Sequence, residues 1–163
     1  MNGTEIVLDA CCGGRMFWFD KHDPRSIYAD TRREEHFLKN KDKMERMEVN
    51  PDIIADFTEM PFPDETFWHV VFDPPHRTTL TRESDAKTWL ARRYGRLLGD
   101  WKIMLTKGFE ECFRVLKPNG TLIFKWCEYD VPLSEILELT PNKPLYGHRS
   151  GNRGDTHWVA FIK

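Results

Sequence analysis

Short apolar runs alternate along this chain with longer stretches whose apolar residues recur at helical spacing. This alternation is typical of an α/β fold with a mostly parallel sheet. Seven of the short runs predict strands, at residues 5–9, 26–29, 52–55, 69–73, 121–126, 144–147 and 157–162. We therefore expect a seven-stranded sheet whose strands are mostly parallel.

Three of the longer stretches predict helices, at residues 15–21, 33–47 and 100–116. The third is the clearest, because its apolar positions 101, 104, 105, 109, 112, 113 and 116 share one helical face. Lys117-Pro118-Asn119-Gly120 follows and predicts the end of this helix, since proline cannot continue a helix and Asn-Gly accepts left-handed dihedral angles. The stretch 33–47 is dense in both charges, which is typical of a solvated helix face.

The composition favours one ordinary domain, which we expect to span residues 1–163. The chain is 40% hydrophobic and 31% charged, and its net charge of −2 creates no global attraction to nucleic acid. No apolar run approaches the roughly twenty residues of a membrane span, and the first strand begins too early for a signal peptide. The four cysteines contain no C-x-x-C pair, so we expect no structural zinc and a cytoplasmic protein with reduced thiols.

A glycine-bearing turn follows the first predicted strand, in the segment Asp9-Ala10-Cys11-Cys12-Gly13-Gly14. A strand that ends in an acidic residue, followed by a small-residue turn and a helix, is how a doubly wound fold builds a nucleotide pocket. Its glycines let the backbone approach a ligand, and the helix would offer N–H groups to an anion. The second strand ends at Asp30-Thr31, seventeen residues past Gly13, where a carboxylate can bind both ribose hydroxyls.

Two further stretches lead into the fourth and fifth strands: Pro61-Phe62-Pro63-Asp64-Glu65-Thr66-Phe67, after Asp56-Phe57, and Arg114-Val115-Leu116-Lys117-Pro118-Asn119-Gly120-Thr121. With the glycine turn, they make nearly the whole chain resemble class I S-adenosylmethionine-dependent methyltransferases. The resemblance implies a Rossmann-like, doubly wound sheet with an antiparallel last strand and helices on both faces. It also implies S-adenosyl-L-methionine as cofactor, an acidic residue (Asp56) facing the adenine amine, and no metal. The implied cofactor-binding residues are Asp9, Ala10, Cys11, Cys12, Gly13, Gly14, Asp30, Thr31, Asp56 and Phe57, although Cys11 and Cys12 depart from the usual Gly-x-Gly-x-Gly pattern.

Asp73-Pro74-Pro75-His76 closes the fourth predicted strand and resembles the Asp-Pro-Pro-aromatic motif of amino-methyltransferases. Enzymes with this motif act on adenine N6, cytosine N4, guanine N2 or a glutamine amide. The nitrogen lone pair of such an amine is delocalised, which makes the amine a poor nucleophile. Asp73 and a nearby backbone carbonyl can accept hydrogen bonds from its two N–H groups, which makes the lone pair available for attack. Pro74 and Pro75 hold that carbonyl rigidly, and positioning can supply much of the rate enhancement. The motif therefore assigns a catalytic role to these four residues.

His76 departs from this motif, which has a Tyr, Phe or Trp that stacks on a flipped base. An imidazole can also stack, more weakly, and could take up the released proton near neutral pH. Two other interpretations stay open: a different acceptor, or an inactive site.

Basic residues follow the acceptor motif and recur before the last strand. The stretch 77–99 is locally basic and contains aromatic residues, so it could contact phosphates, stack on bases and act as a lid. It could equally be a solvated basic helix with one buried stripe. The candidate substrate-binding residues are Arg77, Arg82, Lys125, Arg149 and Arg153.

The sequence thus predicts an N-methyltransferase acting on an exocyclic amine, with adenine N6 in DNA or RNA as the preferred acceptor. The alternatives are methylation of a protein amide or a small-molecule amine, and a catalytically weak cofactor-binding subunit of a methyltransferase complex. No stretch is large enough for a separate target-recognition domain. We therefore expect nucleic acid as a partner, with recognition supplied where needed by a homo- or hetero-oligomeric subunit, and neither membrane nor metal.

Overall fold

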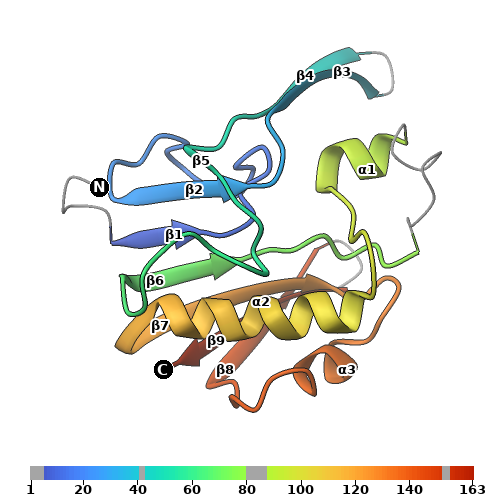
Figure 1. Ribbon diagram of the computed structural model, residues 1–163. Coiled ribbons are helices and arrows are strands. Elements are labelled where there is room, and N and C mark those ends of the chain that lie inside the picture. Colours follow the sequence, from blue (N-terminus) through green and yellow to red (C-terminus); the bar gives the residue numbers. More distant parts are fainter. Residues whose placement is uncertain (1–5, 41–42, 80–87, 152–154) are drawn as a thin grey trace.

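A seven-stranded sheet forms the centre of the computed structural model, which describes residues 6–40, 43–79, 88–151 and 155–163 (Figure 1). The strand order is β5-β2-β1-β6-β7-β9-β8; β9 runs antiparallel to β7 and β8, and the other neighbours are parallel. This confirms the predicted mostly parallel sheet with an antiparallel last strand. The strands are β1 (Val7–Asp9), β2 (Ser26–Asp30), β5 (Ile53–Ile54), β6 (Phe67–Phe72), β7 (Leu116–Cys127), β8 (Tyr146–Ser150) and β9 (Thr156–Ile162).

The strand order reverses at β1. Strands β2 and β5 lie on one side of it, and β6 and β7 lie on the other. In a doubly wound sheet, ligands bind beyond the carboxyl ends of the strands at such a switch point. Asp9 ends β1 and Asp73 directly follows β6, so the topology brings the glycine turn and the Asp-Pro-Pro-His segment to the same place.

One face of the sheet packs against α2 (Trp101–Val115), which crosses in front of it in Figure 1. The ring of Phe109 lies 5.6 Å from that of Phe72 and 4.9 Å from that of Phe124, measured between centroids, and all three are buried. Burial of each such ring contributes about 1.5–3 kcal/mol. The short helix α3 (Leu133–Leu137) adds to the same core. The predicted helix at 100–116 is therefore confirmed.

The predicted helix at 15–21 is wrong, because this segment forms successive turns on the face of the sheet opposite α2. Gly13 and Arg15 have φ angles of +48° and +52°, and these left-handed values prevent a right-handed helix from starting there. The buried Arg15 guanidinium instead lies 3.7 Å from the centroid of the Tyr28 ring, and Trp18 packs edge-on against the same ring. Turns therefore cover this part of the second face, where we expected a helix.

The predicted helix at 33–47 is also wrong. Strands β3 (Glu34–Asn40) and β4 (Lys43–Val49) form an antiparallel hairpin that projects from the sheet (Figure 1). The charges that suggested a helix face pair across the two strands instead, as Arg46 does with Glu35. Met47 and Val49 are buried two positions apart, which is the side-chain period of a strand.

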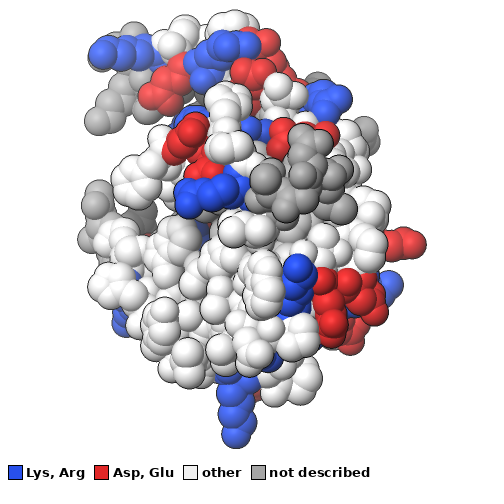
Figure 2. All heavy atoms as spheres, turned by 90° about the vertical axis from the view of Figure 1, so that its left-hand side faces the viewer, with Lys and Arg blue, Asp and Glu red and all other residues white. Residues whose placement is uncertain are grey.

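Helix α1 (Trp89–Tyr94) lies beside this hairpin, beyond the carboxyl ends of the central strands (Figure 1). Thr88 caps its N-terminus, and Gly95, with a φ of +77°, ends it. Arg93 of α1 forms an ion pair of 3.3 Å with Glu45 on β4. Figure 2 shows acidic and basic side chains concentrated over the hairpin, above a surface that carries few charges.

Candidate active site

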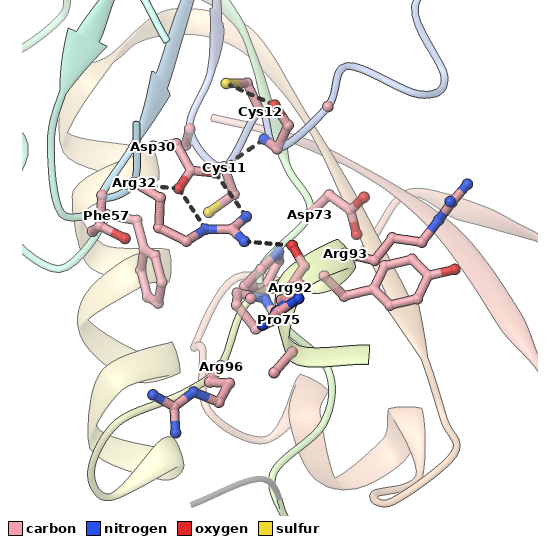
Figure 3. A pocket seen from close by; sticks show the side chains of 18 of the residues that line it. Cys11, Cys12, Asp30, Arg32, Phe57, Asp73, Pro75, Arg92, Arg93 and Arg96 are labelled. Atoms are coloured by element: carbon pink, nitrogen blue, oxygen red, sulfur yellow. Dashed lines mark hydrogen bonds and ion pairs between the residues drawn. The ribbon is translucent and has the colours of Figure 1, made fainter. Parts of the chain in front are cut away.

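A cavity of about 530 Å³ lies at the switch point, between the carboxyl ends of the central strands and α1 (Figure 3). Its size is typical of cofactor and small-molecule sites. It brings together all four predicted catalytic residues and every predicted cofactor residue except Asp9. These lining residues are Ala10, Cys11, Cys12, Gly13, Gly14, Asp30, Thr31, Asp56, Phe57, Asp73, Pro74, Pro75 and His76.

Asp30 anchors the glycine turn to the end of β2. Its Oδ2 accepts a hydrogen bond from the Gly13 backbone N–H at 3.0 Å, and its Oδ1 accepts one from the backbone N–H of Arg32 at 3.0 Å. The Asp30 side chain is only 7% exposed, and what remains accessible faces the cavity. A carboxylate in this position can bind vicinal hydroxyl groups.

Asp9 lies beneath the cavity and is fully buried. The Trp18 indole Nε1–H donates to its Oδ2 at 2.7 Å, and the Cys11 backbone N–H donates to its Oδ1 at 3.3 Å. Burial raises the pKa of the Asp9 carboxyl to about 7, opposed by the Trp18 hydrogen bond and reinforced by the charge of Asp73. Asp9 therefore holds the glycine turn from below and is not among the residues that line the cavity.

Three residues that follow β5, Ala55, Asp56 and Phe57, line a part of the cavity that we call the slot, with Asp56 as its one acidic side chain. Ala55 and Phe57 line it, and the Phe57 ring packs edge-on against Phe72 of the core at 5.3 Å between centroids. The carboxylate of Asp56 accepts hydrogen bonds of 2.8 Å from both the backbone N–H and the hydroxyl of Thr58. This slot suits a flat aromatic base with an edge that can donate a hydrogen bond.

At the acceptor end, Asp73 forms an ion pair with Lys125 at the end of β7. The Lys125 Nζ lies 2.6 Å from Oδ2 of Asp73, and both side chains are about one-fifth exposed. Burial raises the pKa of the Asp73 carboxyl, and the Lys125 charge and hydrogen bond lower it. Among the described residues, Oδ1 of Asp73 accepts no hydrogen bond. That oxygen is available to a donor in the cavity.

His76 is a neutral side chain here. Burial, together with the positive charges of Lys125 and Arg77, lowers the pKa of its imidazole to about 4. A base this weak is a poor proton acceptor at neutral pH, so the proton-accepting role that we considered for His76 loses support. The ring lies 5.3 Å from that of Tyr94 on α1, between centroids, which leaves a stacking role open.

The three predicted substrate-binding cations that the structure describes do not line the cavity. Arg77 forms an ion pair with Asp130 at 3.3 Å, and Arg149 forms one with Glu128 at 3.1 Å. Lys125 is held by Asp73. Two more predicted residues, Arg82 and Arg153, lie outside the described residues.

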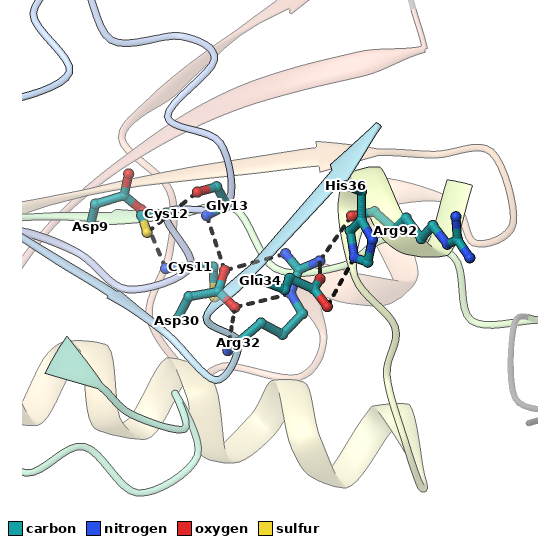
Figure 4. Close-up of polar contacts among 9 residues, drawn as sticks. All are labelled: Asp9, Cys11, Cys12, Gly13, Asp30, Arg32, Glu34, His36 and Arg92. Atoms are coloured by element: carbon teal, nitrogen blue, oxygen red, sulfur yellow. Dashed lines mark hydrogen bonds and ion pairs between the residues drawn. The ribbon is translucent and has the colours of Figure 1, made fainter. Parts of the chain in front are cut away.

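Sequence reasoning missed several residues that line the cavity, and two of them, Glu34 and His36, belong to the mispredicted hairpin. The most conspicuous is Arg32, whose guanidinium contacts Asp30 and the backbone of α1 (Figure 4). Its place two positions after the strand-end acid was the one signal that could have identified it. The missed residues are Met16, Arg32, Glu34, His36, Ala55 and Met104, whereas the lining residues Ala91, Arg92, Arg93, Tyr94, Gly95, Arg96 and Leu98 belong to the stretch 77–99 that we considered for substrate contacts.

Membrane-spanning helices and groups of metal ligands were also sought in the structure. Within the described ranges, every helix is too short or too polar to cross a bilayer. In the same part of the chain, no group of three or more His, Cys, Asp and Glu side chains could hold a metal ion.

No protein-family model and no curated protein sequence matches this chain. Solved structures do match. A SAM-dependent methyltransferase from Methanosarcina mazei has 11% identity and a TM-score of 0.55, with 100% of this chain and 94% of that chain covered. The N-methyltransferase NodS from Bradyrhizobium japonicum WM9 has 10% identity and a TM-score of 0.53, with 98% and 85% covered.

A third match is the 1,6-didemethyltoxoflavin-N1-methyltransferase of Burkholderia thailandensis, solved with 1,6-didemethyltoxoflavin and S-adenosylhomocysteine bound. It has 14% identity and a TM-score of 0.52, with 97% of this chain and 70% of that chain covered. These likenesses show that the chain has the fold of S-adenosylmethionine-dependent methyltransferases. They confirm the fold that the sequence resemblance implied.

Proposed function

We propose that this chain is an S-adenosylmethionine-dependent N-methyltransferase that acts on an exocyclic amine. One observation carries the proposal: a single cavity contains the donor-side carboxylates of Asp30 and Asp56 and the acceptor-side carboxylate of Asp73. A methyl donor and an amine must come within about 3–3.5 Å of each other to react, and a shared cavity allows this.

The residues present fit this cofactor. The carboxylate of Asp30 suits the two ribose hydroxyls, and the slot between Ala55 and Phe57 suits the adenine ring, with Asp56 at its edge. Gly13, with its left-handed φ of +48°, lets the turn approach the ligand without a side chain in the way. When bound, S-adenosylmethionine supplies an electrophilic methyl group on a sulfonium sulfur.

The acceptor-side residues would orient the amine. Oδ1 of Asp73 accepts one amine N–H, while Lys125 holds Oδ2 and favours the ionised carboxylate. Pro74 and Pro75 restrict the backbone that follows, so the neighbouring carbonyl keeps its direction. With both hydrogens engaged, the nitrogen lone pair is free to attack. The rings of His76 and Tyr94 provide a surface on which the acceptor can stack.

Adenine N6 in DNA or RNA is the acceptor that the Asp-Pro-Pro segment favours. The amine of adenine is delocalised into its ring, so it needs the orientation that Asp73 provides. Arg92 of α1 lines the same cavity and could approach a phosphate.

A small-molecule amine is the second candidate, favoured by a specific observation. Arg77, Arg93 and Arg149 are each held by an acidic side chain, so few of the basic residues near the site are available to phosphates. Two of the structurally similar proteins are N-methyltransferases, and one of these was solved with its small heteroaromatic compound.

Transfer of radiolabelled methyl from S-adenosylmethionine tests the proposal. The acceptors are separate pools of DNA, total RNA, tRNA, cell protein and a low-molecular-weight extract. The matched control is Asp73→Asn, which keeps the shape of the side chain and should abolish transfer while leaving S-adenosylhomocysteine affinity unchanged. Label in DNA or RNA supports the adenine acceptor, and label in the extract alone supports the second candidate. Cofactor binding without transfer to any pool would indicate a cofactor-binding subunit that requires a partner.

A further inference from the structure

We propose that Arg32 is a gate on the cofactor site: its side chain occupies the position that ribose hydroxyls need at Asp30, and it ties that position to helix α1. The inference rests on the proposed function, because it concerns the same cofactor site. It adds a residue that controls entry of the cofactor and couples that entry to the acceptor side.

The first observation is that Asp30 has no accepting capacity left while Arg32 is in place. The Arg32 Nε donates to Oδ1 at 3.1 Å, and its Nη2 donates to Oδ2 at 3.4 Å. The backbone N–H groups of Gly13 and Arg32 already donate to the same two oxygens. A carboxylate has about four lone-pair sites, and four donors occupy them. Ribose hydroxyls can therefore reach Asp30 only if the Arg32 side chain leaves.

The second observation is that the other side of the guanidinium is fastened to α1. The Nη1 of Arg32 donates to the backbone carbonyl of Arg92 at 3.1 Å and to Glu34 Oε1 at 3.2 Å (Figure 4). The guanidinium also lies against Gly95, since a Cβ at that position would be 3.4 Å from Arg32 Cζ. Arg32 thus bridges the cavity from the end of β2 to the end of α1.

Glu34 provides the alternative partner. It also lines the cavity, and its contact with Arg32 does not involve Asp30. When ribose hydroxyls bind Asp30, the guanidinium can remain paired with Glu34 and still leave the ribose position. The mostly buried charge of Arg32 then keeps a counter-ion when it leaves Asp30.

Displacement of Arg32 also releases its bond to the Arg92 carbonyl. Helix α1 carries Tyr94, whose ring contacts His76 on the acceptor side. Cofactor binding therefore removes one tie between the end of β2 and α1, the helix that borders the acceptor position. The apparent affinity for cofactor is reduced by the fraction of molecules in which the gate is closed.

Isothermal titration with S-adenosylhomocysteine tests the gate on the full chain. Arg32→Met keeps the aliphatic stem and removes the guanidinium. Arg33→Met is the matched control, because the neighbouring Arg33 donates to the Pro51 carbonyl at 2.8 Å and does not line the cavity. We expect Arg32→Met to bind S-adenosylhomocysteine about tenfold more tightly than wild type does, because one mostly buried competing ion pair is removed. Arg33→Met should bind it with the affinity of wild type.

Hydrogen exchange gives a second readout that does not depend on ligand. Peptides covering Trp89–Tyr94 should exchange faster in ligand-free Arg32→Met than in wild type, and addition of S-adenosylhomocysteine to wild type should produce the same acceleration. Thermal melts establish that each variant is folded.

The outcomes separate this inference from the proposed function. Equal or weaker ligand binding by a folded Arg32→Met variant, beside measurable binding by wild type, would overturn the gate and leave the methyltransferase proposal intact. Absence of binding by all three proteins would overturn both. Tighter binding without faster exchange in α1 would overturn the coupling to the acceptor side.

Discussion

Replacement of Asp9 by asparagine should change how the stability of the protein depends on pH. Asp9 is fully buried, and burial raises the pKa of its carboxyl from 3.8 to about 7. A group whose pKa is higher in the folded chain than in the unfolded chain stabilises the fold at low pH. That stabilisation is complete below about pH 4 and is lost as the pH rises through the folded pKa near 7.

The magnitude follows from the pKa difference. Between about pH 5 and pH 8, ionisation of Asp9 should remove about 3 kcal/mol from the free energy of unfolding of wild type. Asparagine does not ionise, but it can accept only one of the hydrogen bonds from Trp18 and Cys11, a loss of about 1–2 kcal/mol at every pH. The variant should therefore match wild type near pH 5 and exceed its stability by about 2–3 kcal/mol near pH 8.

Urea unfolding followed by tryptophan fluorescence, at four pH values between about 5 and 8, measures this difference. Asp20→Asn is the control, because Asp20 is an exposed acid in the same loop, and its curve should parallel that of wild type. Trp18→Phe removes the donor that lowers the pKa of Asp9, so it should steepen the loss of stability above neutral pH. If Asp9→Asn and wild type differ by a constant amount across the whole pH range, the reasoning is refuted.

Two further predictions concern the acceptor side and the core. Lys125→Met removes the charge that lowers the pKa of Asp73, so the acidic limb of the pH profile of the transfer rate should move to higher pH. Urea unfolding should show a loss of about 1–3 kcal/mol in the free energy of unfolding, because the ion pair is mostly buried. An unchanged pH profile would contradict the role of Lys125. Gly108→Ala places a Cβ 2.6 Å from Phe72 Cζ and 2.8 Å from Phe57 Cδ2. Overpacking of about 1–3 kcal/mol should outweigh the gain of about 1 kcal/mol in helix propensity, because both rings are buried; a more stable variant in urea would show that the rings yield freely.

Most of the strands and the positions of the strand-end acids could be predicted because they depend on local patterns. Asp30, Asp56 and Asp73 each follow a short apolar run, and parallel strands place their carboxyl ends at one edge of the sheet. The helix at Trp101–Val115 was predictable for the same reason, since its apolar spacing persists over four turns.

The two mispredicted helices show where local patterns fail. Arg15 takes a left-handed φ because its guanidinium can bury itself over Tyr28, a residue on another strand. In the hairpin, Glu35 and Arg46, eleven residues apart in the sequence, pair across two strands. In both cases the two residues in contact are far apart in the sequence, so a local sequence pattern does not reveal the contact.

The sequence by itself determined most strands of the sheet and the carboxylates at their ends, because strand-end residues are positioned by their own strand. Only the tertiary structure decided which charges are free. It pairs Lys125 with Asp73, Arg77 with Asp130, and the missed Arg32 with Asp30. The pKa of a charged group at a site depends on its partners and its burial. Both are properties of the folded chain rather than of the residue type.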